Sequence, residues 1–252
     1  ASIISSGPFI VESATPGERI DYARNPHYWK KDQAGTQLPY LDKFKIEVVP
    51  DANNTFVRLS QGSLDLADRV RPTDHIEFSK TTESVRAVDA GPGLSIDHMW
   101  FNLNVAADGK PVAGDIKYSW FNDKRFRQAI SMAIDRRSIT SITLQGLASP
   151  LYGFVSPANK VWIAPELPKI ELSIEKASQL LKDAGFQKGG SGYSPVLTDA
   201  KGNPVEFSLI FPAENEARKL MASVIQEDLA KLGIKVQVVP IENAALSERW
   251  TK

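Results

Sequence analysis

Apolar residues recur at helical spacing in the stretch between residues 121 and 139. They lie at i, i+4, i+7 and i+8, which predicts a helix with one buried stripe. The stripe consists of Phe126, Ile130, Ala133 and Ile134. Asp123 is placed to cap this helix, because its carboxylate can accept hydrogen bonds from the free amides of the first turn. Asp135 is placed to cap a second helix, with Ile139 and Ile142 on its apolar side.

Alternation and helical spacing together predict a strand, a helix and a strand near the end of the sequence. Residues 195–211 have the pattern of a hairpin whose second strand alternates apolar and polar positions. Residues 214–232 carry a long apolar stripe at helical spacing, and residues 234–238 alternate again. This order is typical of a βαβ unit with two parallel strands. Upstream, Ser173 is placed to cap a further helix that ends at Gly185.

The first hundred residues contain shorter elements. Two apolar runs flank the turn at residues 15–17 (TPG) and predict a hairpin. Residues 43–49 alternate as a strand, Asp51 can cap a short helix, and residues 63–68 (SLDLAD) have the pattern of a second strand. We therefore expect a βαβ unit here too. The remaining predicted elements are a helix at 72–80 and strands at 84–89 and 95–105.

The predicted strand at 95–105 has an unusual face. Alternation places Trp100 and Asn102 on one side and Met99 and Phe101 on the other. A face of Trp and Asn side chains is uncommon in a dry core, so we consider it a candidate site. The polar stretch that follows, rich in Gly and Pro, has the composition of a linker.

These elements predict an α/β protein with two domains. Residues 1–105 would hold the first hairpin and the first βαβ unit. Residues 106–252 would hold the helix pair, the second hairpin and the second βαβ unit.

Composition excludes several classes of protein. The 252 residues include 30 basic and 30 acidic side chains, so charge favours neither nucleic acid nor an anionic membrane surface. No window approaches the ~20 apolar residues that a membrane span requires. Without cysteine the chain has no disulfide framework and no thiol chemistry. The chain starts at Ala1, which indicates a removed leader or a piece of a longer protein.

The sequence contains no motif for catalysis, metal binding or cofactor binding. His27, His75 and His98 are far apart and match no metal-ligand spacing. Gly-x-Ser-x-Gly, a phosphate-binding Gly loop and His-Glu-x-x-His do not occur. We therefore predict no catalytic residue, no metal and no cofactor, and the sequence favours a binding protein over an enzyme.

Several motifs together resemble one known family. FNDKRFRQAISMAIDRRSI (121–139) resembles the signature of extracellular solute-binding proteins of family 5, the peptide/nickel class, which are the capture subunits of ABC importers. The first hairpin with its NPHYW loop, the segment QGSLDLAD and the helices SIEKASQLLKDAGF and MASVIQEDLAKLG are similar to family segments in the same order. The similarities extend from Gly7 to Glu242.

The resemblance implies a two-lobed fold of the periplasmic-binding-protein type II. It implies an incomplete one, because family members are considerably longer. The function implied is capture of a peptide-like solute between the lobes and its delivery to the permease subunits of an ABC importer. The alternative ligand is a metal chelate, a sugar or another small solute. The alternative classes of protein are the sensor module of a regulator and an enzyme. The implied location is periplasmic or extracellular, with the full-length protein either free or anchored as a lipoprotein.

Ligands of α/β lobes gather at the carboxyl ends of parallel strands, near helix N-termini. The predicted ligand-binding residues are Asp68, Arg69, Trp100, Asn102, Tyr152, Phe211, Glu214 and Asn215. Phe154 lies in the same aromatic loop as Tyr152. Dipeptide-binding family members hold the ligand carboxylate with an Arg in the loop before the last long helix. Here that loop reads FPAEN without an Arg, and Arg218 lies within the helix, so the resemblance does not fix the solute.

Overall fold

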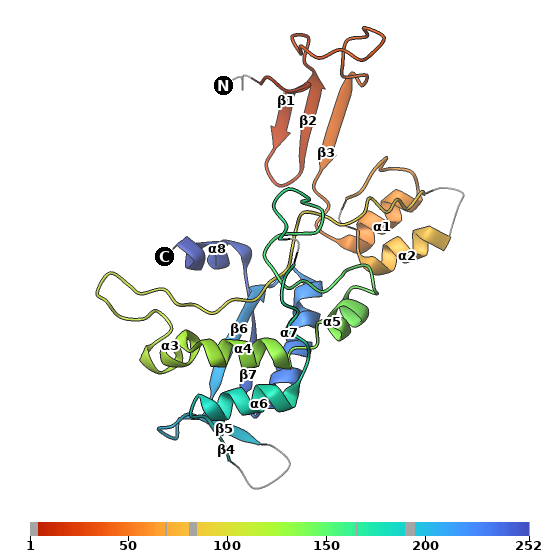
Figure 1. Cartoon of the computed structure of the whole chain (residues 1–252). Helices are drawn as coiled ribbons and strands as arrows, with labels where there is room; N and C mark the ends of the chain where they lie inside the picture. Colours follow the sequence, from red (N-terminus) through yellow and green to blue (C-terminus); the bar gives the residue numbers. More distant parts are fainter. Residues whose placement is uncertain (1–4, 69, 81–84, 165, 190–194, 252) are drawn as a thin grey trace. The chain divides into compact units, whose positions relative to one another are not determined.

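The computed structural model describes residues 5–68, 70–80, 85–164, 166–189 and 195–251. The chain forms two compact units, Ala1–Val88 and Asp89–Lys252, which are described separately (Figure 1). Within the described ranges, no helix has the length and apolar character needed to cross a membrane.

Unit 1 begins with the predicted hairpin, extended by a third strand. The sheet consists of β1 (Phe9–Thr15), β2 (Arg19–Arg24) and β3 (Lys43–Glu47), antiparallel and in that order. Gly17 closes the β1–β2 turn with φ of 77°, a backbone region that residues with a β-carbon rarely adopt. The ring of Phe44 packs against the rings of Phe9 and Tyr22, at 5.8 and 5.6 Å between centroids. The hairpin is therefore confirmed.

The βαβ unit predicted for the first hundred residues is wrong. β3 pairs antiparallel with β2, with Phe44 opposite Tyr22, and so belongs to the sheet of the hairpin. The SLDLAD segment is no strand, and Leu66 is 80% exposed. Two alternating leucines do not make a strand unless a neighbour satisfies the backbone amides. The strand predicted at 84–89 is also wrong for residues 85–89, whereas Ser84 lies outside the described residues.

Two short helices complete unit 1. α1 (Ala52–Ser60) is capped as predicted, since the Asp51 carboxylate accepts a hydrogen bond from the Asn54 amide at 2.7 Å. α2 (Pro72–Lys80) joins it through a stack of Phe56 on Phe78, with 4.7 Å between ring centroids.

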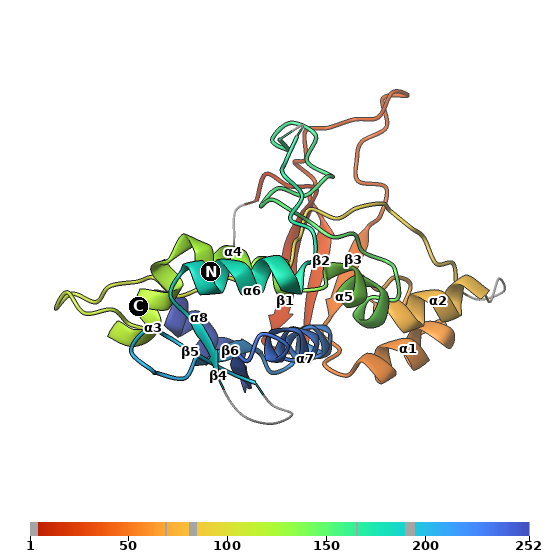
Figure 2. The ribbon, with the colours of Figure 1, turned by 60° about the horizontal axis from the view of Figure 1, so that its bottom comes forward.

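Unit 2 contains the second βαβ unit, as predicted. It consists of β6 (Glu206–Pro212), α7 (Glu216–Ala230) and β7 (Lys235–Ile241). The two strands are parallel, with Phe207 opposite Val236. The other helices are α3 (Asp115–Asn122), α4 (Lys124–Ala133), α5 (Arg136–Thr143), α6 (Ile174–Asp183) and α8 (Asn243–Thr251). α4 and α6 lie side by side, and α7 packs against both strands (Figures 1 and 2).

The hairpin predicted at 195–211 is confirmed only around its turn. β5 (Val196–Thr198) pairs with β4 (Gln187–Gly189). Its link to the chain just before β6 is an isolated bridge between Thr198 and Pro204. The amide of Leu197 donates instead to the carbonyl of Gly233, at 2.8 Å. Gly233 has φ of 83°, and a β-carbon there would lie 2.8 Å from the Leu197 nitrogen, so this approach requires glycine.

The predicted helix pair is confirmed, and its stripe forms the centre of the core. Asp123 caps α4 and Asp135 caps α5, each accepting a hydrogen bond from a first-turn amide. All four residues of the stripe are buried. The prediction for Ile142 is wrong, because Ile142 is 61% exposed. α5 packs against α7 with Thr143 buried, so Ile142 points away from that contact.

A buried carboxylate connects α7 to the junction between α4 and α5. Asp228 accepts a hydrogen bond from the Asp135 amide at 2.9 Å and an ion-paired hydrogen bond from Lys231 at 2.7 Å. The bond to Asp228 raises the pKa of Lys231. Because a buried amide without a partner is costly, this contact fixes the position at which the second helix begins.

Asp199 organises the turn between β5 and β6. Its carboxylate accepts hydrogen bonds from the indole of Trp120 at 3.0 Å, from the amide of Lys201 at 2.9 Å and from the amide and side chain of Asn203. Burial alone would raise the pKa of Asp199, but these hydrogen bonds lower it to about 2. The carboxylate thereby ties the turn to α3, which carries Trp120.

The depressed pKa of Asp199 predicts a dependence of stability on pH. The folded value of about 2 lies below the ordinary 3.8, so the contribution is complete above about pH 4 and is lost as the pH falls toward 2. We expect the stability difference between the wild type and Asp199→Asn to shrink over that window in urea unfolding curves. A difference that stays constant from pH 5 to pH 2 would contradict it.

Candidate functional site

The predicted ligand-binding residues fall in both units. Asp68 is exposed in unit 1, and Arg69 lies outside the described residues. The other six lie in unit 2, which can therefore be examined as a site on its own. Phe211 is only 6% exposed, so its ring supports the loop before α7 and offers little surface to a solute.

The FPAEN loop lies at the carboxyl end of β6, where a solute is expected in α/β lobes. Asn215 caps α7, and its side-chain oxygen accepts a hydrogen bond from the Arg218 amide at 2.9 Å. Glu214 is exposed beside it. The loop is thus held by the cap and by a hydrogen bond from the Ala213 amide to the Ile241 carbonyl, at 2.9 Å.

The segment 95–105 is not the strand predicted for it, because within the described residues it makes only one isolated bridge, from Val105 to Pro111. Its alternation is nevertheless preserved. Met99 and Phe101 pack against the core of unit 2. His98 and Trp100 contact each other, with 5.1 Å between ring centroids. The expectation that Trp100 lies opposite Met99 and Phe101 therefore agrees with the contacts, although the segment is irregular.

An ion pair ties this segment to α7. The Arg218 guanidinium donates from Nε to the Asp97 carboxylate at 2.8 Å. Both side chains remain more than a third exposed, so the pair stabilises by no more than about 1 kcal/mol. Its effect is positional, because it holds the residues around Trp100 against the start of α7.

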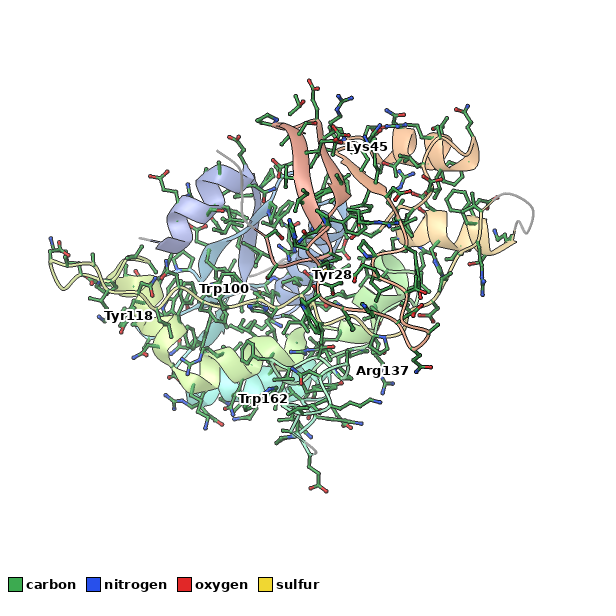
Figure 3. All side chains as sticks on the ribbon, turned by 90° about the horizontal axis from the view of Figure 1, so that it is seen from above. Tyr28, Lys45, Trp100, Tyr118, Arg137 and Trp162 are labelled. Carbon is green, nitrogen blue, oxygen red and sulfur yellow. The ribbon has the colours of Figure 1, made fainter. Side chains whose placement is uncertain are left out.

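Three rings from two segments form what we call the aromatic cluster: His98, Trp100 and Phe154. The His98 ring lies 5.6 Å from the Phe154 ring at an interplanar angle of 81°. Trp100 is 53% exposed and Phe154 is 78% exposed. Figure 3 labels Trp100 and also Trp162, an exposed ring that lies well apart from it.

The loop that carries Phe154 is fixed by packing. Ser156 is buried, and its hydroxyl donates to the Gly93 carbonyl at 2.5 Å. A β-carbon at Gly153 would lie 2.5 Å from a methyl group of Leu167, so this backbone runs directly over the leucine. The Ser156 hydrogen bond therefore ties the loop that carries Phe154 to the backbone at Gly93.

The remaining predicted residues make local contacts. The half-buried Tyr152 ring lies 5.9 Å from the guanidinium carbon of Arg136. Burial lowers the pKa of Arg136, and Tyr152 opposes that shift. The side-chain oxygen of Asn102 accepts a hydrogen bond from the Asn104 amide at 2.9 Å. Their contact with a solute stays a prediction.

Two residues of this region were not predicted from the sequence, Asp97 and His98. A usable signal existed for His98, since alternation places it on the same side of the segment as Trp100. No sequence signal connects Asp97 to Arg218, because 121 positions separate them along the chain.

Exposed rings thus lie beside an irregular segment that an ion pair ties to the start of α7, and their contact with a solute stays a prediction. Comparison with known proteins identifies the family. Residues 1–252 match the bacterial extracellular solute-binding proteins, family 5 (middle region), so the chain belongs to that family. Family 5 proteins are the solute-binding proteins of ABC transporters and are periplasmic or extracellular.

Three relatives illustrate the similarity. A probable ABC transporter-binding protein of Deinococcus radiodurans is 34% identical over 95% of this chain and 40% of its own length. The oligopeptide-binding protein AppA of Bacillus subtilis is 31% identical over 98% of this chain and 41% of its own length. The heme-binding protein A of Haemophilus influenzae is 28% identical over 98% of this chain and 39% of its own length.

The structure of AppA in complex with a nonapeptide confirms the fold. It superposes with a TM-score of 0.66 at 29% identity, covering 96% of this chain and 43% of AppA. The chain is thus an incomplete two-lobed fold, and it spans about 40% of the length of the relatives it matches.

Proposed function

We propose that the chain is part of a protein that captures a peptide-like solute between two lobes and delivers it to the permease subunits of an ABC importer. The observation that carries this proposal is its similarity to AppA over nearly the whole chain, since AppA has been crystallised with a nonapeptide. The aromatic cluster supports it, because exposed rings beside backbone hydrogen-bonding groups suit the mixed surface of a peptide.

The two lobes would be built from residues 1–105 and 106–252. The structure divides into compact units after Val88, and residues 89–105 pack with unit 2 through Met99 and Phe101. We propose that this segment is the place where the chain passes from one lobe to the other. Closure of the lobes over the solute would then exclude water from the aromatic cluster and the FPAEN loop. The full-length protein would act outside the cytoplasmic membrane, free or as a lipoprotein.

A second cargo, heme or a similar planar chelate, is favoured by one relative, the heme-binding protein A of Haemophilus influenzae. The rings of the aromatic cluster could stack on a porphyrin as well as on a peptide side chain.

A crystal structure of the full-length protein, purified without added ligand, tests these proposals. We expect electron density for an extended peptide backbone beside Trp100 and the start of α7. Co-purified heme, visible by its absorbance, would favour the second cargo. Density for an unrelated small molecule, or a solute bound away from unit 2, would contradict the peptide proposal.

A further inference from the structure

We propose that the outer edge of β6 binds a further strand, parallel to β6 and supplied by the segment that follows α8 in the full-length protein. The inference goes beyond the proposed function and holds whichever solute is captured, because it concerns how unit 2 is completed. The backbone groups that β6 and β7 turn outward carry it, together with the path of the chain around these two strands.

The parallel ladder between β6 and β7 uses every second residue of each strand. Its first bond runs from the Lys235 amide to the Val205 carbonyl at 3.0 Å, and a bond from the Ala213 amide to the Ile241 carbonyl at 2.9 Å continues it past the strand ends. The intervening residues turn their amides and carbonyls to the other edge. On β6 these residues are Glu206, Ser208 and Ile210. In the part of the chain that the structure describes, their backbone groups make no hydrogen bond.

The outward edge of β7 is protected by its own residues. The Val236 carbonyl accepts a hydrogen bond from the side chain of Gln226 on α7, at 2.7 Å. Pro240 has no amide hydrogen to offer a further strand. Proline and covered backbone groups are usual on the outer strands of sheets. β6 has a proline only at its last residue, Pro212, so the amides before it remain available.

α8 brings the chain back toward β6. It follows β7 directly and packs against β6, with Leu246 only 3% exposed (Figure 1). Consecutive parallel strands are usually neighbours or separated by one strand, and β7 already occupies one edge of β6. A strand after α8 would therefore reach the other edge. The chain spans about 40% of the length of its relatives, so a protein of their length has the residues to supply it.

The segment 95–102 runs in the opposite direction to β6. Asp97 binds Arg218, just beyond the carboxyl end of β6, whereas the Phe101 ring lies 6.0 Å from the ring of Phe207, near its amino end. The segment keeps the alternation of a strand but forms no ladder within the described ranges. An added strand parallel to β6 would be antiparallel to this segment and would have a second edge to offer it.

An extended peptide solute is the competing occupant of this edge. Solutes of α/β lobes gather beyond the carboxyl ends of the strands, whereas the outward groups of β6 lie along the strand itself. A strand joined to α8 also has a high effective concentration at this edge, which a free peptide or a second copy lacks.

Hydrogen–deuterium exchange resolved to single residues tests the proposal in the full-length protein, freed of solute. We expect the amides of Ser208 and Ile210 to exchange within about tenfold of that of Leu209, which faces β7, after correction for intrinsic rates. The matched control is Val238, whose amide points to the outer edge of β7 and should exchange at least about tenfold faster than that of Val239.

A pair of proline substitutions tests the same edge. Ser208→Pro removes an outward amide and places the proline ring where the added strand would lie, so we expect a lower melting temperature of the full-length protein. Val238→Pro makes the same backbone change at the outer edge of β7 and should lower it clearly less. A Ser208→Pro protein that does not fold would agree with the proposal, and equal effects of the two substitutions would contradict it.

A crystal structure of the full-length protein identifies the occupant. We expect Ser208 and Ile210 to be hydrogen-bonded to a parallel strand from the segment after α8. Fast exchange at both residues, or direct pairing of β6 with residues 95–102, would overturn the inference. Protection that appears only with added peptide would assign the edge to the solute, and protection that rises with protein concentration would assign it to a second copy. Apart from the peptide-dependent result, which would support it, these outcomes leave the proposed capture of a solute untouched.

Discussion

Replacing Ile130 with alanine should lower the free energy of unfolding by about 2–5 kcal/mol. The Ile130 side chain on α4 is 1% exposed and belongs to the core cluster of unit 2, together with residues of α6 and of the βαβ unit. Truncation removes buried methyl groups and leaves a cavity that the surrounding helices can close only in part. Chemical denaturation followed by tryptophan fluorescence measures the change.

The chain offers a matched control for this substitution. Ile142 is the same residue type on the neighbouring helix, and it is 61% exposed. Ile142→Ala should change the free energy of unfolding by no more than about 0.5 kcal/mol. Equal effects of the two substitutions would mean that the stripe on α4 does not face the core.

The sequence predicted α4, α5 and the final βαβ unit because each combines a local signal with a periodic one. Asp123 and Asp135 supply caps whose geometry depends on a few adjacent amides only. The apolar stripe through Phe126 and Ile130 then predicts which side of α4 is buried. On α4, where both signals agree over ten residues, the stripe is buried as predicted. On the eight-residue α5 the cap was predicted correctly, whereas Ile142 is exposed.

The predicted strands failed where pairing depends on distant residues. The segment SLDLAD alternates for only two leucines, and the partner edge it needed belongs to the hairpin. The segment around Trp100 kept its two faces but pairs with no strand in the part of the chain that the structure describes. Alternation therefore predicted correctly which side chains of this segment face the core, but it predicted strand pairing wrongly. The side chains themselves determine which face is buried, whereas backbone pairing requires a partner strand that the fold brings alongside.

The candidate site was predicted in part. Alternation and composition indicated Trp100, and strand polarity indicated the loop that ends in Asn215. The aromatic cluster as a unit could not be predicted, because His98 and Phe154 are brought together by the packing of an irregular loop. The ion pair of Asp97 with Arg218 likewise depends on the path of the chain between them.

Residues 1–252 alone should bind a peptide solute far more weakly than the full-length protein. A closing cleft works because both walls remove water from the solute and replace its lost hydrogen bonds. In this chain Trp100 and Phe154 remain more than half exposed, and the chain spans about 40% of the length of its relatives. If the other wall of the cleft supplies one charged group that is desolvated on closure, its absence costs about 2–5 kcal/mol, which corresponds to roughly 30-fold to several thousandfold in affinity.

Calorimetric titration of a peptide library against both forms of the protein tests the central claim most directly. The account predicts saturable binding of at least one peptide to the full-length protein, and affinity lower by about 30-fold or more for residues 1–252. Equal affinity of both forms for the same peptide would place the whole site within this chain and contradict capture between two complete lobes. No binding of any peptide by the full-length protein would contradict the proposed function.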